Sequence, residues 1–203
     1  MIKLLRWFLV LSCLVPVHLF AADRFETIKK DLAASKCTYF SFLSTIESSV
    51  FDQVDSAQGY AYIEDDGKYH VQVGSDEYIY DRHHLYTWSK ANNQVTVETA
   101  DDGGAGTDQV SFVTRLDEFF STKPVKKGEE YRLIRKPGKS RNLPDTMLVY
   151  LDSAAPRISE IEYRDINGEI NRLHFTDQQT SLDCDSSRFL PNFPDSVEVI
   201  KLW

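Results

Sequence analysis

Apolar residues follow a helical period in two segments of the chain. In the segment 23–35, Phe25, Ile28 and Leu32 lie three or four positions apart, with charged residues between them. This spacing puts the apolar side chains on one face and predicts an amphipathic helix of about three turns. The segment 111–120, which reads Ser-Phe-Val-Thr-Arg-Leu-Asp-Glu-Phe-Phe, has the same spacing and predicts a second, shorter helix whose apolar side must be covered.

Most of the remaining chain consists of short β-rich runs separated by turn sequences. Asp65-Asp66-Gly67 and Asn167-Gly168 are typical of tight turns between antiparallel strands. The alternation of apolar and polar residues in these runs indicates strands with one buried face. The predicted strands cover residues 37–51, 58–64, 68–73, 78–80, 85–88, 95–97, 146–151, 157–164 and 169–177, with a last strand that ends at Ile200.

The succession of strands and the two helices predict one mainly β domain. The glycine-rich segment 101–108 is expected to be a loop, and no internal repeat or long linker divides the chain. A single curved antiparallel sheet of about eleven strands must curl at this size. We therefore expect an incomplete barrel whose open side is covered by the helices, an arrangement that can leave a lined cavity.

The N-terminal segment changes this picture because it differs in composition from the rest. Lys3 and Arg6 precede an apolar run that ends at Ala21 and Ala22, which is the layout of a secretory signal. The run is interrupted by Pro16 and is short for a membrane-spanning helix. We expect residues 1–21 to be a cleaved signal peptide and residues 22–203 to form the exported domain. Lipidation at Cys13 is the weaker alternative.

The net charge of the chain restricts the classes of partner that it can bind. Without Lys3 and Arg6, the chain has 21 Lys and Arg against 31 Asp and Glu, a formal charge of 21 − 31 = −10. This balance argues against a nucleic-acid partner and against a polybasic membrane surface. The stretch 123–139 is locally basic, and is interpreted as either a solvated face or a docking site.

Two cysteines remain after the signal, Cys37 and Cys184. In an oxidising compartment they can form a disulfide that closes most of the chain into one loop. The alternative is two separate buried thiols, which behave as small apolar side chains. No CxxC or HExxH motif occurs, so the sequence predicts no metal site and no cofactor.

Asp81-Arg82-His83-His84 is the strongest candidate for catalysis. Adjacent histidines on a strand point to opposite faces, so His83 and His84 cannot both ligate one metal without a turn between them. We interpret them as surface or turn residues. The sequence contains no GxSxG elbow and no phosphate loop. We therefore expect that the protein has no catalytic residue and is not an enzyme. An unrecognised envelope hydrolase using these residues is a remaining alternative.

The order of the strands resembles that of the LolA family, periplasmic carriers of outer-membrane lipoproteins. The stretches that carry the resemblance are Gly59-Tyr-Ala-Tyr-Ile63, Lys68-Tyr-His-Val71, Leu85-Tyr-Thr-Trp88, Gln94-Val-Thr-Val97 and Asp165-Ile-Asn-Gly168. The similarity runs from the first helix to about Ile200. One position departs from the family: LolA proteins carry an arginine that holds the helical lid where this chain has Asp65-Asp66-Gly67.

The resemblance implies a monomeric carrier in the periplasm of a Gram-negative bacterium. It would bind the acyl chains of lipoproteins in an apolar cavity, receive them from an inner-membrane release complex and deliver them to an outer-membrane acceptor. A lipid- or lipoprotein-sensing periplasmic domain of the same fold is the alternative. The residues expected to line the cavity, from strand position and side-chain type, are Phe42, Tyr62, Tyr69, Val71, Ile79, Leu85, Trp88, Phe112, Leu116, Phe119 and Met147.

Overall fold

The computed structural model describes residues 23–48, 52–99, 110–139 and 142–203. The predicted signal peptide and the predicted glycine-rich loop lie outside these ranges. In chain order the elements are α1 (Arg24–Ala34), β1 (Cys37–Ser48), β2 (Gln53–Glu64), β3 (Tyr69–Val73), β4 (Asp76–Tyr80), β5 (His84–Ser89), β6 (Gln94–Thr99), the 3-10 helix η1 (Ser111–Thr114), α2 (Leu116–Phe119), β7 (Phe120–Lys126), β8 (Glu130–Arg135), β9 (Thr146–Leu151), β10 (Ile158–Arg164), β11 (Ile170–Gln179), the 3-10 helix η2 (Ser186–Phe189) and β12 (Glu198–Leu202).

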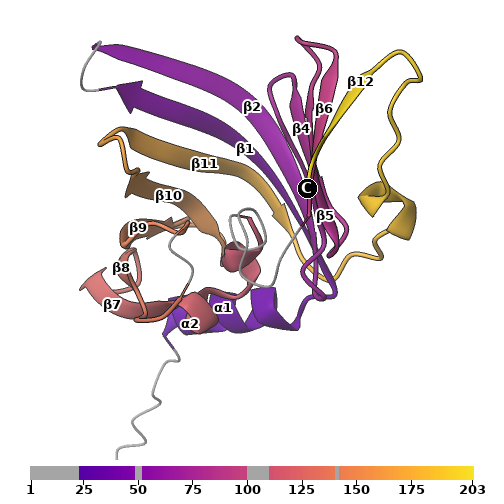
Figure 1. The fold of residues 1–203 in the computed structure, drawn as a ribbon. Helices are drawn as coiled ribbons and strands as arrows, with labels where there is room; N and C mark the ends of the chain where they lie inside the picture. The colour runs from indigo at the N-terminus through magenta and orange to yellow at the C-terminus, as the bar shows by residue number, and fades with distance from the viewer. Residues whose placement is uncertain (1–22, 49–51, 100–109, 140–141) are drawn as a thin grey trace, which may run out of the picture.

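All the described strands belong to one sheet. Its spatial order is β12-β6-β5-β4-β3-β2-β1-β11-β10-β9-β8-β7, so β1 joins two meanders by pairing with both β2 and β11. Figure 1 shows that this sheet curves strongly without closing, and that α1 and α2 lie across one end of its concave side. The predicted mainly β class, with an incomplete barrel and helices on the open side, is confirmed.

Three details of the sequence prediction need correction. The described residues form twelve strands, close to the predicted number of about eleven, but β12 runs parallel to β6, whereas the prediction was an antiparallel sheet. The basic stretch 123–139 contains most of β7 and all of β8, which were not predicted as strands. The predicted helix 111–120 is a 3-10 turn followed by a single α-helical turn, and Phe120 already begins β7.

The helix α1 begins with a capped turn and packs on the sheet through one face. The carboxylate of Asp23 accepts a hydrogen bond from the Phe25 backbone N–H at 3.0 Å, which satisfies one of the free donors at the helix start. Phe25, Ile28 and Leu32 are buried, as their spacing predicted. The Phe25 ring lies 4.6 Å from that of Tyr131, so α1 is attached to the β8 side of the sheet.

The two faces of the sheet carry separate apolar clusters. The main core lies on the concave side and includes the buried faces of α1 and α2. A smaller cluster on the convex side contains Val95, Val97 and Val197, with Trp88 and Phe193 packed against it. The C-terminal segment therefore covers part of the convex face. Within the described ranges, no helix is long and apolar enough to cross a membrane.

Cys37 and Cys184 are joined in a disulfide, with a Cα–Cα distance of 5.8 Å. Cys37 is the first residue of β1, and Cys184 precedes η2. The bond therefore attaches the C-terminal segment to the junction of α1 and β1.

Candidate functional site

The candidate site is an open cavity of about 1870 Å³ on the concave face of the sheet. Ligand pockets for small molecules are usually about 300–1,000 Å³, so this one is large enough for an extended apolar ligand. Alternate residues of β1, β2, β3 and β11 point into it because side chains on a strand face opposite sides in turn. The apolar and aromatic part of the lining comprises Phe40, Phe42, Ala61, Ile63, Tyr69, Val71, Val73, Tyr78, Leu85, Val110, Phe112, Val113, Phe119, Leu143, Tyr163, Leu173 and Phe175.

Gly59 makes room for one of these side chains. It is paired with Phe42 across β1 and β2, and a Cβ atom at Gly59 would lie 2.6 Å from the Phe42 ring and 2.5 Å from the carbonyl oxygen of Gln72. Real Cβ atoms do not approach other atoms this closely. Glycine is therefore required here by a close approach of ring and backbone, and it lets the Phe42 ring lie across β2.

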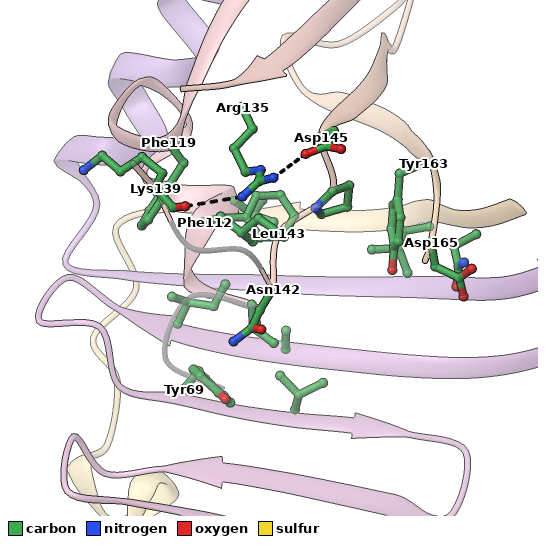
Figure 2. Close-up of a pocket in the computed structure, with 18 of the residues that line it drawn as sticks. Tyr69, Phe112, Phe119, Arg135, Lys139, Asn142, Leu143, Asp145, Tyr163 and Asp165 are labelled. Carbon is green, nitrogen blue, oxygen red and sulfur yellow. Dashed lines mark hydrogen bonds and ion pairs between the residues drawn. The ribbon is translucent and has the colours of Figure 1, made fainter. Parts of the chain in front are cut away.

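Charged residues gather on one part of the cavity lining. Arg135, Lys136 and Lys139 come from the end of β8 and the turn after it, and we call them the rim cations. In Figure 2, Arg135 lies between Asp145, with which it forms an ion pair, and the carbonyl oxygen of Lys139, to which it donates a hydrogen bond. The C-terminal end of the predicted basic stretch thus borders the cavity. The turn at Asp65-Asp66-Gly67 is not part of the lining.

Two tyrosines of the lining have a raised pKa. Burial raises the pKa of Tyr163, and the nearby carboxylate of Asp165 raises it further. Burial also raises the pKa of Tyr78, with a contribution from Asp76. Both phenols therefore lose their protons at higher pH than a tyrosine in water does.

The structure brings together six of the eleven residues that the sequence suggested for the cavity. These six are Phe42, Tyr69, Val71, Leu85, Phe112 and Phe119. Leu116 and Met147 belong to the concave core but do not border the cavity. The prediction needs correction for Tyr62, Ile79 and Trp88. The alternation of side chains along the strands puts these three on the convex face, whereas Tyr69, Tyr78 and Leu85 point to the concave face. A ligand-binding role for the six stays a prediction.

Several lining residues were missed by the sequence analysis. Phe40 lies two positions from Phe42 on the same face of β1, so the period of two was a usable signal there. Ala61 and Ile63 of β2 were missed because the prediction placed Tyr62, on the opposite face of that strand, in the cavity. Tyr163, Leu173 and Phe175 belong to β10 and β11, whose place beside β1 is a long-range pairing. Leu143 lies in the connection from β8 to β9, where no periodic pattern marks it.

Asp81 organises a turn at the start of β5. Its carboxylate accepts hydrogen bonds from the backbone N–H groups of His83 at 2.8 Å and His84 at 2.7 Å, and Arg82 has a φ of 82°. His83 is exposed, while the His84 ring lies 5.8 Å from the Trp203 ring. This arrangement is a turn held by an aspartate, and it agrees with the interpretation of these residues as surface or turn residues.

Comparison with known proteins gives structural matches only. No family model and no curated protein matches the chain. An uncharacterized conserved protein from Thermus thermophilus aligns with a TM-score of 0.50 and 11% identity, over 88% of this chain and 97% of that one. A DUF1329 family protein from Desulfovibrio piger aligns with a TM-score of 0.49 and 10% identity, over 80% and 92% of the two chains.

A LolA superfamily protein from Nitrosomonas europaea is also among the matches, with a TM-score of 0.44 and 9% identity, over 82% of this chain and 97% of that chain. At these identities the likeness concerns the fold alone.

Proposed function

We propose that this chain binds the acyl chains of lipoproteins in the concave cavity and carries them from the inner to the outer membrane. The observation that carries the proposal is the cavity itself, about 1870 Å³, with apolar and aromatic residues along the inner face of an unclosed sheet and polar residues along its border. Each methylene group buried there contributes roughly 0.8 kcal/mol. Acyl chains are simple biological ligands that can fill the apolar part of this cavity.

A carrier must also release its cargo. Several fully buried acyl chains would bind too tightly for release, so burial has to be partial or offset by movement of the covering elements. The helix α2 and the connection that contains Leu143 border the cavity, and α1 packs beside α2 in the concave core, while the sheet stays open at its edges β12 and β7. Release would require movement of α2 and this connection.

The proposed location is the periplasm. The disulfide between Cys37 and Cys184 requires an oxidising compartment, and the N-terminal segment has the composition of a secretory signal. A carrier is useful where a lipid-modified cargo has to pass through water between two membranes. The disulfide and the apolar cavity therefore support the same location and role.

Native mass spectrometry of the protein purified from an envelope extract without detergent tests the proposal. We expect a bound species that carries acylated peptide, and we expect it to disappear after delipidation. A Phe42→Asp, Val71→Asp double variant puts charge into the lining and should be purified empty, whereas Lys126→Gln, which lies outside the lining, should retain the ligand. Co-purified free lipid would favour the sensing alternative, and an empty cavity in the wild-type protein would contradict both.

A further inference from the structure

The rim cations form a positive cluster on an acidic protein. Arg135, Lys136 and Lys139 are brought together by the end of β8 and the following turn, and all three belong to the cavity lining. The chain as a whole has a formal charge of −8. A positive cluster at the border of an apolar cavity is therefore a local feature that the overall charge does not explain.

The rim cations are held at the border of an apolar surface. The Lys139 ammonium lies 5.5 Å from the centre of the Phe119 ring and 3.4 Å from a carboxylate oxygen of Glu118. Arg135 pairs with Asp145 and donates to the Lys139 carbonyl oxygen at 3.3 Å. The cluster thus presents positive charge next to an aromatic ring that lines the cavity.

The carboxylates that pair with these cations are open to solvent. The Asp145 side chain is 86% exposed and that of Glu118 is 45% exposed. Exposed ion pairs contribute only about 0–1 kcal/mol, so exchanging one for another anion costs little. Arginine binds phosphate with two parallel hydrogen bonds, which are stronger and more specific than an exposed pair with a single carboxylate.

We infer that the rim cations bind the phosphate of an anionic phospholipid whose acyl chain enters the cavity. This inference rests on the acyl-binding cavity of the proposed function and adds a second class of ligand to it. The phosphate takes the place of the Asp145 carboxylate beside Arg135, and Lys139 adds a second positive charge. The apolar tail then extends from Phe119 along the concave face.

Two single-chain lipids with the same acyl chain test the inference. The purified, delipidated protein is titrated with lysophosphatidylglycerol, which carries an anionic phosphate, and with the corresponding monoacylglycerol, which has no phosphate, and binding is followed by calorimetry. We expect the anionic lipid to bind about fivefold more tightly, as two exposed ionic contacts would give. The preference should disappear in about 1 M NaCl, where the Debye length is about 3 Å.

Charge-neutral variants locate the effect. Arg135→Gln with Lys139→Gln should remove the preference and leave the affinity for the monoacylglycerol unchanged. The matched control is Lys126→Gln with Lys127→Gln, which removes the same charge from the β7–β8 hairpin outside the cavity lining and should keep the preference. Because Arg135 contacts the β8–β9 connection, Lys139→Gln alone, checked by circular dichroism, serves as the second variant and should weaken the preference.

The outcomes separate this inference from the proposed function. If neither lipid binds, the acyl-binding cavity is wrong and both proposals fail. If both lipids bind equally, or if the control pair removes the preference, the rim cations do not recognise phosphate and only this inference fails. Glycerol 3-phosphate, which has no acyl chain, should bind far more weakly than the anionic lipid. Equal binding would identify a site for soluble phosphate esters and overturn the lipid assignment.

Discussion

Gly59 has no side chain, and the Phe42 ring occupies the space where one would be. Gly59→Ala should therefore lower the free energy of unfolding by about 1–3 kcal/mol, the range for overpacking a tight site. The Gln72 carbonyl oxygen is also within 2.5 Å of the added carbon, so a change of the Phe42 rotamer cannot fully relieve the clash. Urea denaturation measures the effect. Ser56→Ala on the exposed part of β2 is the control and should be nearly neutral; equal stability of both variants would contradict this account.

The sequence did not show on which face of the sheet each aromatic side chain lies. Tyr60 and Tyr62 on β2, and Tyr86 and Trp88 on β5, look like core residues of a one-faced sheet. They lie instead on the convex face, and Phe193 from the C-terminal segment packs 5.4 Å from Trp88. Both faces of the sheet are therefore partly covered, and the parity of aromatic residues alone does not distinguish the cavity face from the outer face.

The helix α1 is connected to α2 by the buried ammonium group of Lys29. It pairs with Glu26 at 2.8 Å and with Asp117 of α2, while its own side chain is only 5% exposed. Burial lowers the pKa of Lys29, but the bonds to Asp117 and Glu26 outweigh burial and hold the pKa above its usual range. The Lys29 ion pairs therefore link α1 to α2.

Substitutions at Lys29 should separate its packing from its charge. Lys29→Ala should destabilise the protein by about 2–4 kcal/mol because the buried stem leaves a void. Lys29→Met retains the volume, and the carboxylates of Glu26 and Asp117 are exposed enough to be rehydrated, so its cost should stay below about 1.5 kcal/mol. Thermal denaturation with exposed Lys30→Ala as the control tests this. A loss in the Met variant as large as in the Ala variant would show that the ion pair dominates.

Elements with regular local patterns were predictable, and those set by distant contacts were not. The meander β2 to β6 and the helix α1 follow from alternation, turn residues and helical spacing. β7 was missed because its lysines and Pro124 suit an exposed edge, where charge protects the strand from further pairing, and β8 was missed because it lies in the same basic stretch. The parallel pairing of β12 with β6 depends on the path of the C-terminal segment over the convex face, which no local pattern encodes.

The disulfide connects distant parts of the whole molecule. Cys37 and Cys184 are separated by 147 positions, so the bond restricts nearly the entire unfolded chain. On the loop-entropy model, reduction should lower the free energy of unfolding by about 4–5 kcal/mol. Guanidinium denaturation with and without reductant measures it, and Cys184→Ser should match the reduced wild type. An unchanged midpoint on reduction would show that the unfolded chain is not constrained by the bond.

Tyrosines throughout the molecule determine how the free energy of unfolding changes with pH in the alkaline range. Burial raises the pKa of a group of them above the usual value of about 10; the group comprises Tyr60, Tyr78, Tyr86, Tyr131, Tyr150 and Tyr163. The folded protein keeps these protons at a pH where the unfolded chain loses them. Since the folded state then binds more protons, the free energy of unfolding falls as pH rises above about 10, and continues to fall up to the raised pKa values.

Tyr78 and Tyr163 make this titration sensitive to the cavity because both line it. An acyl ligand that displaces water from the cavity should raise their pKa further, since desolvation disfavours the phenolate. The ultraviolet absorbance of tyrosinate, followed with and without lysophosphatidylcholine, should therefore shift to higher pH with ligand. The shift should shrink in a Tyr78→Phe, Tyr163→Phe variant and persist in Tyr150→Phe, which lies outside the lining. A ligand that binds without changing the titration would place the acyl chain away from these two tyrosines.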